Sequence, residues 1–226
     1  MNAFELTGRA RSHVVELADP PCTLHVDAAP AFLALRRAAA EAGIDLGVVS
    51  SFRDFEAQAH IWNEKYLGRR ALFDRSGREL RVDELDPDAR IDAILCWSAI
   101  PGASRHHWGS EIDVIDRAAV TPGMKIRLVP EEYLSGPFVP LARWLTGNIG
   151  RFGFFRPYTT DRGGVAPEPW HLSYAPVSVP ALVQLTPQLL RDALHHSPLE
   201  GLSALLPRIA AVHEQYVMRV DAPAAV

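Results

Sequence analysis

The stretch Ser104-Arg-His-His-Trp-Gly-Ser-Glu-Ile-Asp113 decides the fold more than any other part of this chain. Gly102, just before it, and Gly109, within it, are residues typical of turns. His106 is therefore expected in a loop directly ahead of a strand. The residues that follow, 111–116, read as that strand.

Alternation along this predicted strand places two acidic side chains together. Glu111 and Asp113 point to one face, and Ile112 and Val114 point to the other. The apolar face suits a core, whereas carboxylates on an inward face are unfavourable unless they are paired or bind a metal. His106, reaching over the turn, and Asp113 could therefore supply two ligands to one cation.

A second imidazole comes from the distant segment Glu168-Pro-Trp-His171. Two histidine nitrogens and one carboxylate oxygen, with a fourth position open for water, are the pattern of a catalytic zinc site. Glu168 is predicted to take a proton from the attacking water and to pass it to the leaving amine. Arg53, expected between a strand and a helix, is placed to bind a substrate carboxylate or a developing oxyanion.

Each of these segments alone also fits an ordinary role. A Glu-x-x-His sequence can simply open a strand, and an arginine after a strand often forms a surface ion pair. A soluble domain without metal is the corresponding alternative for the whole chain. The joint occurrence of the three segments, in this order, favours the metal site.

Other elements are predicted from capping residues and apolar spacing. We expect helices over 27–43, from Asp54 onward and over 137–150, and strands over 45–50, 154–155 and 171–174. Residues 67–100 are the most charged region. They are interpreted as an insertion or lid, and a solvated surface loop is the favoured form.

The C-terminal part is predicted to be helical over 179–220. Thr186-Pro187 is expected to start one helix, and Ser197-Pro-Leu-Glu200 reads as a capping box that starts another. Pro207 is expected to kink or break that second helix. The histidines of this part are not predicted to bind metal; they are His195, His196 and His213.

Composition excludes several classes of protein. The 226 residues are 48% hydrophobic and 22% charged, which is ordinary for a globular chain and unlike a disordered one. A formal charge of −4 argues against a general nucleic-acid binder. Cys22 and Cys96 allow at most one disulfide, and their pairing is not predicted. No stretch has the length and apolarity of a membrane helix.

Together the motifs resemble those of a known family. Ser104-x-His106-x-x-Gly109-x-x-x-Asp113 with Glu168-x-Trp170-His171 is similar to the zinc D-alanyl-D-alanine carboxypeptidases and dipeptidases of the vancomycin-resistance type. These enzymes share a fold group with lysostaphin-type and hedgehog-type proteins. The resemblance extends to Ser51-Phe-Arg53 followed by Gln58, and it covers about residues 24–176.

The resemblance implies a role for individual residues. His106, Asp113 and His171 would hold Zn²⁺, and Glu168 would be the general base and acid. Arg53 would bind the carbonyl or the terminal carboxylate of the substrate. The further candidates for substrate contacts are Gln58, Ser104, Ser51, Glu111 and Trp170.

Three positions call for comment beside this resemblance. Glu111 stands where the family usually has a small apolar residue. It is predicted either to pair with an arginine such as Arg105 or to receive a substrate ammonium and so restrict the enzyme to short peptides. Trp108 is bulkier than the family norm and would either narrow the pocket or belong to the core. His107 is not expected to be a ligand.

The predicted fold is α+β, with a small antiparallel sheet flanked by helices and a zinc cleft on the sheet. Residues 1–178 would form the metallopeptidase domain, including 67–100, and 179–226 a helical C-terminal extension packed on the same domain. The predicted partner is a peptidoglycan-derived peptide, with no nucleic acid and no membrane span. The sequence does not indicate an oligomeric state.

The predicted function is a zinc-dependent peptidase of the D-alanyl-D-alanine carboxypeptidase kind, acting near the C-terminus of peptidoglycan stem peptides. The alternatives at the same site are an L,D-carboxypeptidase, a D-Ala-D-Ala dipeptidase and a peptidoglycan endopeptidase. A zinc-containing binding module is the non-enzymatic alternative, and Glu168 argues against it. No leader is visible, so a cytoplasmic location is expected, with a periplasmic or extracellular one if a leader is missing.

Overall fold

A four-stranded antiparallel sheet forms the centre of the computed structural model, which describes residues 1–195 and 197–223. Its strands, in spatial order, are β3 (Leu46–Ser50), β6 (Glu111–Asp116), β8 (His171–Tyr174) and β7 (Phe154–Phe155). Two hairpins stand outside it: β1 (Val14–Ala18) with β2 (Pro21–His25), and β4 (Leu72–Phe73) with β5 (Glu79–Leu80). The predicted α+β fold with a small antiparallel sheet is confirmed.

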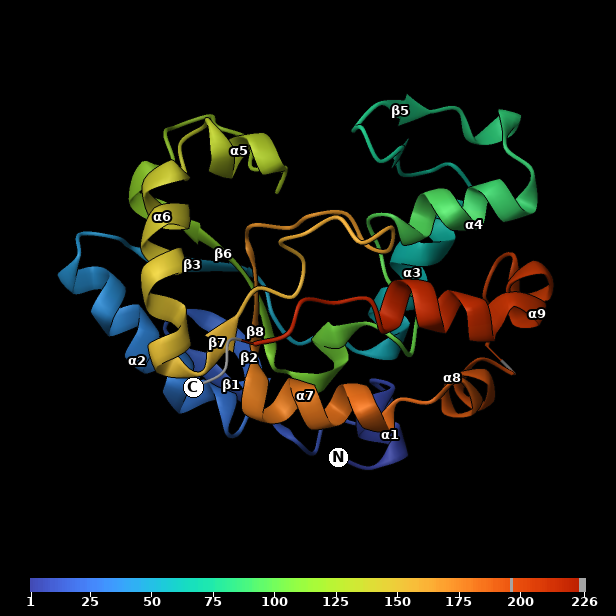
Figure 1. Cartoon of the computed structure of the whole chain (residues 1–226), viewed down its shortest axis with the longest axis horizontal. Coiled ribbons are helices and arrows are strands. Elements are labelled where there is room, and N and C mark those ends of the chain that lie inside the picture. The colour runs from blue at the N-terminus through green and yellow to red at the C-terminus, as the bar shows by residue number, and fades with distance from the viewer. Residues whose placement is uncertain (196, 224–226) are drawn as a thin grey trace.

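Helices surround this sheet (Figure 1). The α-helices are α1 (Ala3–Leu6), α2 (Ala28–Glu41), α3 (Phe55–Tyr66), α4 (Pro87–Leu95), α5 (Pro130–Leu134), α6 (Val139–Asn148), α7 (Ala175–Gln184), α8 (Pro187–Leu194) and α9 (Leu202–Val212). The short 3₁₀ turns are η1 (Val82–Glu84), η2 (Arg105–Trp108), η3 (Arg117–Ala119) and η4 (Ile149–Phe152), and η5 (His213–Val217) is a π-helical turn.

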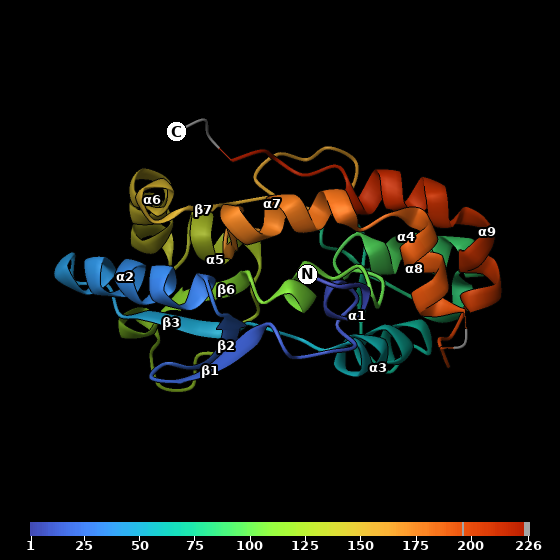
Figure 2. The ribbon, with the colours of Figure 1, turned by 90° about the horizontal axis from the view of Figure 1, so that it is seen from below.

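The molecule has two hydrophobic clusters. One lies between the sheet and helices α2 and α6, and it includes Phe32, Leu46 and Ile112. The other joins α3, α4 and the C-terminal helices, and it includes Trp62 and Leu205. Figures 1 and 2 show these two sets of helices at opposite ends of the long axis.

The C-terminal helices share the second cluster with the N-terminal half of the chain. Leu190 of α8 and Ile209 of α9 are almost completely buried in the same cluster as Phe55 of α3. The indole Nε1 of Trp62 also donates to the carbonyl of Glu200 over 3.0 Å. Helices α8 and α9 are therefore part of the packing that supports α3.

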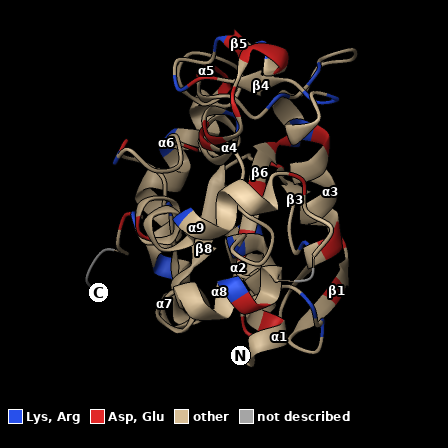
Figure 3. Cartoon of the chain, turned by 90° about the vertical axis from the view of Figure 1, so that its right-hand side faces the viewer, with Lys and Arg blue, Asp and Glu red and all other residues tan. Residues whose placement is uncertain are grey.

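The charged region 67–100 differs from the favoured prediction of a solvated loop. Its second half is helix α4, capped by Asp86, whose Oδ1 accepts from the amide of Ala89 over 2.8 Å. Ile91 and Ile94 of this helix are fully buried. A count of charged residues does not reveal such a helix, because three apolar residues at helical spacing, Ile91, Ile94 and Leu95, are enough to bury one face of it. In Figure 3 acidic and basic residues of the region lie on its outer side, around the β4–β5 hairpin.

The predicted start of the last helix is wrong, and of the two outcomes predicted for Pro207, a kink or a break, the break does not occur. Helix α9 begins at Leu202 after Gly201, whose φ is 72°, and no side chain caps it. Pro207 lies inside α9, which continues to Val212. Proline removes one backbone hydrogen bond, but Leu205 and Ile209 pack into the core on either side of it and hold the helical path. His196 lies outside the described residues.

Two of the predicted helix starts are confirmed with their caps, whereas a cap expected at Asp27 is not formed. Asp54 caps α3 by accepting from the amide of Ala57 over 2.9 Å, and Thr186 caps α8 by accepting from Leu189 over 3.1 Å. Asp27 precedes α2 but makes no capping hydrogen bond. Within the described residues, Cys22 and Cys96 are free thiols, and no helix has the length and apolarity needed to cross a membrane.

Candidate active site

Strand register brings the predicted zinc ligands together. Asp113 of β6 stands directly opposite His171 of β8, and Glu111 stands opposite Ser173. Paired residues of antiparallel strands share a face, so these four side chains lie on one side of the sheet. Their neighbour Ile112 points to the other side, into the core.

His106 reaches the same place from η2, immediately before β6. Its Nδ1 lies 2.8 Å from the carbonyl oxygen of Ser51. A carbonyl can only accept, so Nδ1 carries the proton and the lone pair of Nε2 is free. Burial lowers the pKa of His106 to about 3, which keeps the ring neutral. Nε2 lies 3.4 Å from Oδ2 of Asp113.

His171 faces Asp113 through Nδ1, whereas His106 faces it through Nε2. Its Nε2 lies 2.8 Å from Oε2 of Glu111, and its Nδ1 lies 3.1 Å from Oδ1 of Asp113. Burial alone would lower the pKa of His171, but its contacts with Asp113, Glu111 and Glu168 raise it well above the ordinary value. The three carboxylates that surround the His171 imidazole thus favour a positive charge on it.

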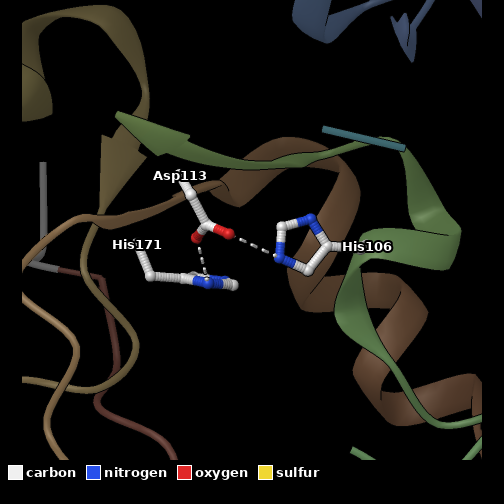
Figure 4. A group of neighbouring side chains, drawn as sticks. All are labelled: His106, Asp113 and His171. Atoms are coloured by element: carbon white, nitrogen blue, oxygen red, sulfur yellow. Dashed lines mark ion pairs between the residues drawn. The ribbon is translucent and has the colours of Figure 1, made fainter. Parts of the chain in front are cut away.

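These three side chains fit a zinc ion. One ligand atom from each of His106, Asp113 and His171 lies within 4.8 Å of the others, and all three residues are buried (Figure 4). Zinc at about 2.0–2.2 Å from tetrahedral ligands keeps those ligands about 3.4 Å apart. Oδ1 of Asp113 is buried and makes no hydrogen bond of good geometry among the described residues, so its charge is balanced by the ion pair with Nδ1 of His171 over 3.1 Å. A metal ion between these two groups would take over that role.

Glu168 borders this cluster. Its Oε2 lies 3.3 Å from Nδ1 of His171, and its side chain is 13% exposed. The backbone fixes it from both sides, because its amide donates to the carbonyl of Tyr158 over 2.8 Å and its carbonyl accepts from the amide of His171 over 3.2 Å. Burial raises the pKa of Glu168, although its contact with His171 acts in the opposite direction. A carboxylate whose pKa is raised accepts a proton more readily and is suited to proton transfer.

Arg53 lies where β3 leads into α3. Its Nη1 donates to Oε1 of Gln58 over 2.7 Å, and its Nη2 donates to Oγ of Ser50 over 2.8 Å. Burial lowers the pKa of Arg53, while the charges of Asp113 and Glu168 raise it. The guanidinium is therefore close to the cluster, and two of its five N–H donors are fixed by the protein.

Three predicted substrate-binding residues support other parts of the site. Gln58 is 1% exposed and holds Arg53, while its Nε2 donates to the carbonyl of Ala99 over 2.8 Å. Ser51 holds His106 through its carbonyl. Ser104 is 3% exposed and accepts the amide of His107 over 3.0 Å through its carbonyl oxygen.

Both tryptophans of the motifs are core residues. Trp170, which is predicted to contact the substrate, is 4% exposed, and its ring lies 5.7 Å from that of Tyr133. Trp108 is fully buried and donates to the carbonyl of Leu6 over 3.1 Å. His107 is not in the metal cluster. Its Nδ1 donates to the carbonyl of Arg53 over 2.6 Å, and its Nε2 accepts from the amide of Gly102 over 3.0 Å.

Glu111 also differs from one of its two predicted roles. The side chain has no exposed surface, so no substrate ammonium reaches it directly. Its Oε2 lies 3.3 Å from Nε of Arg105, which is the alternative ion pair. With burial opposing them, Arg105 and His171 lower the pKa of Glu111 to about 2.

Sequence reasoning missed Ser110 and Ser173, whose hydroxyls each donate to Oε1 of Glu111 over 2.9 Å. Arg105 also donates to the Ser173 hydroxyl, over 2.7 Å. Ser173 was detectable in principle, since it stands two residues after His171 and therefore on the same face of β8.

A small antiparallel sheet that carries a buried His-Asp-His cluster, with a glutamate and an arginine beside it, defines a zinc-hydrolase type of site. The family model of VanY, D-alanyl-D-alanine carboxypeptidase, matches residues 22–177. The chain belongs to this family.

Individual proteins agree with the family model. An uncharacterized protein of Haemophilus influenzae is 33% identical over 122 residues, covering 53% of this chain and 93% of that protein. The structure of VanYB in complex with D-alanine-D-alanine is 25% identical, with a TM-score of 0.51, covering 81% of this chain and 88% of that one. A VanY D,D-pentapeptidase variant in complex with Zn(II) shares the fold, at 24% identity and a TM-score of 0.52, covering 87% of this chain and 92% of that one.

Proposed function

We propose that this protein is a zinc-dependent carboxypeptidase that removes the terminal D-alanine from peptidoglycan stem peptides. The observation that carries the proposal is the convergence of one ligand atom each from His106, Asp113 and His171 within 4.8 Å, with Glu168 3.3 Å from His171. Membership of the D-alanyl-D-alanine carboxypeptidase family supports the substrate class.

His106, Asp113 and His171 would hold the metal. When bound there, zinc supplies a Lewis acid that polarises the peptide carbonyl and makes water more acidic. The protein contributes neutral His106, fixed by Ser51, and an Asp113 carboxylate that lies between His106 and His171.

Glu168 moves the proton of the reaction. Its carboxylate takes a proton from the attacking water as the new C–O bond forms at the peptide carbonyl. It then delivers that proton to the nitrogen of the leaving D-alanine as the C–N bond breaks. The raised pKa of Glu168, caused by burial, suits both the acceptance and the return of the proton.

Arg53 orients the substrate. Its contacts with Gln58 and Ser50 fix the plane of the guanidinium and leave the remaining N–H donors free. These donors can bind either the carbonyl oxygen, which gains negative charge during attack, or the terminal carboxylate.

The test is hydrolysis of a peptide ending in D-Ala-D-Ala by the zinc-loaded protein, followed by mass spectrometry. We expect loss of one alanine, and we expect Glu168→Gln to lower kcat by about 10²–10⁴-fold while zinc remains bound. Glu168→Gln keeps the shape of the side chain and removes its proton acceptor. Equal activity of Glu168→Gln and the wild type would contradict the proposed role.

The product mass separates the alternative reactions. Release of the dipeptide D-Ala-D-Ala or internal cleavage would assign a different specificity to the same site. A zinc-loaded protein that leaves D-Ala-ended peptides and muropeptides intact would favour the binding-module alternative and overturn the proposal.

A further inference from the structure

Glu111 is a fully buried carboxylate that contacts His171, one of the candidate metal ligands. It lies on β6 two residues before Asp113, so it shares the face of the sheet on which the cluster forms. No step of the proposed reaction uses it. Burying such a charge is unfavourable unless every oxygen has a partner, so its presence calls for an explanation.

Both carboxylate oxygens of Glu111 have partners. Oε1 accepts from the hydroxyls of Ser110 and Ser173 over 2.9 Å each, and from Nη2 of Arg105 over 3.3 Å. Oε2 lies 2.8 Å from Nε2 of His171 and 3.3 Å from Nε of Arg105. Four side chains thus hold Glu111 in place, and one of them is a candidate zinc ligand.

The contact with His171 decides which ring nitrogen can bind a metal. A carboxylate accepts, so Nε2 of His171 carries a proton and donates it to Glu111. The other nitrogen, Nδ1, is the one that faces Asp113 and Glu168. A histidine held through one nitrogen offers the other to the metal in a fixed orientation.

We propose that Glu111 is a positioning residue for the zinc ligand His171. It fixes the tautomer with the proton on Nε2, holds the ring with Nδ1 toward the ion, and is itself held by Arg105 and two serines. This inference rests on the proposed zinc site and adds the residue that prepares one ligand.

The competing explanation is that Glu111 only pairs with Arg105 and stabilises the fold. Removing Glu111 alone does not separate the two, because it leaves the buried Arg105 unpaired. The double variant Glu111→Met/Arg105→Met removes both charges and keeps similar volume, a change that is often neutral for stability. In the double variant, Nε2 of His171 has nevertheless lost its hydrogen-bond acceptor, the Glu111 carboxylate.

The experiment measures zinc affinity of the wild type and the double variant by competition with a chromophoric chelator, beside urea unfolding of the metal-free proteins. We expect zinc affinity to fall about 10–100-fold in the double variant, whatever its stability. Glu132→Gln is the matched control. Glu132 is a buried glutamate that holds the amides of Arg127 and Leu128, and its replacement should leave zinc affinity unchanged. Wild-type zinc affinity in the double variant would overturn the proposal.

A second measurement needs no variant. Long-range ¹H–¹⁵N spectra of the zinc-loaded wild type should show His171 protonated on Nε2 and metal-bound through Nδ1, and His106 with the opposite arrangement. A His171 bound through Nε2 would overturn the role of Glu111 while leaving the zinc enzyme intact. Absence of zinc binding by the wild type would instead contradict the proposed function.

Discussion

Gln58 and Ser50 set the direction of the Arg53 guanidinium, so the substrate contact proposed for Arg53 depends on these two side chains. Gln58 supplies one of the two contacts and is itself fixed by the carbonyl of Ala99. Replacing it frees the guanidinium and leaves that carbonyl without its donor.

Gln58→Leu should therefore lower kcat/KM by about tenfold, or about 1.4 kcal/mol of transition-state binding. Zinc affinity should stay unchanged, because Gln58 contacts no ligand residue. Steady-state kinetics on a D-Ala-ended peptide and chelator competition measure the two effects. Gln184→Leu, at an exposed position, is the control. A kcat/KM within twofold of the wild type would show that Arg53 does not depend on Gln58.

At the level of residues, the clustering of the candidate metal ligands was predictable, because strand alternation places Asp113 on the inward face and the turn before the strand brings His106 toward it. The predicted separation of Glu111 and Asp113 from Ile112 is what the structure has. The contacts made by Glu111 were not predictable, because its partners come from η2 and β8 as well as from Ser110, which precedes β6. Alternation along a strand predicts which side of the sheet a side chain faces. The groups that it contacts on that side depend on tertiary packing.

Among the elements, α4 shows how a charged segment can still contribute to the core. Ile94 is fully buried within the cluster that also contains Trp62. Ile94→Ala should lower the free energy of unfolding by about 2–5 kcal/mol. Glu79→Ala, an exposed position on β5 of the same region, should change it by less than about 0.5 kcal/mol. Urea unfolding measures both, and equal small effects would mean that α4 is not part of the core.

Helix α3 carries a cation in an unfavourable environment. Lys65 donates to Oγ of Ser98 over 2.7 Å and forms no ion pair within the described part of the chain. Burial lowers its pKa from 10.5 to about 8, despite the opposing charge of Glu168. The unfolded chain therefore binds the proton more tightly than the folded one. The buried charge therefore lowers the free energy of unfolding by its full amount below pH 8, and this penalty decreases as the pH rises toward 10.5.

Lys65→Met should raise the free energy of unfolding by about 3 kcal/mol at pH 7, since the pKa falls from 10.5 to about 8 and one pKa unit corresponds to about 1.4 kcal/mol. The gain should shrink through the interval from pH 8 to 10.5. Urea unfolding at a series of pH values tests this. The exposed Lys125 provides the control, because Lys125→Met removes the same charge without relieving burial. A pH-independent gain would contradict the assignment.

Helix ends were less predictable than helix positions. Asp54 and Thr186 cap their helices as predicted, since a capping hydrogen bond is a local interaction. The start of α9 after Gly201 and the continuation of this helix beyond Pro207 depend on packing of α9 in the second hydrophobic cluster. Local rules therefore fail where tertiary contacts outweigh one hydrogen bond.

On the scale of the whole molecule, the site lies where the chain passes from one hydrophobic cluster to the other. Trp108 of η2 belongs to the cluster with α3, whereas Ile112 of β6 belongs to the cluster with α2. His106 and Asp113 lie along this connection. Zinc bound there joins residues supported by both clusters, so the ion should stabilise the entire fold.

Zinc at one hundred times its Kd should add about 2.7 kcal/mol to the stability of the folded state. For a protein of this size that corresponds to a rise in Tm of about 5–10 °C. Calorimetry with and without a chelator measures the rise. Asp113→Ala should abolish it, and an equal rise in that variant would place the stabilising ion elsewhere.

The central claim is that one zinc ion is held by His106, Asp113 and His171. Anomalous diffraction at the zinc edge from crystals of the zinc-loaded protein tests it most directly. We predict a single strong peak about 2.0–2.2 Å from Nε2 of His106, an oxygen of Asp113 and Nδ1 of His171. A peak at other residues, or none at this cluster, would contradict the claim.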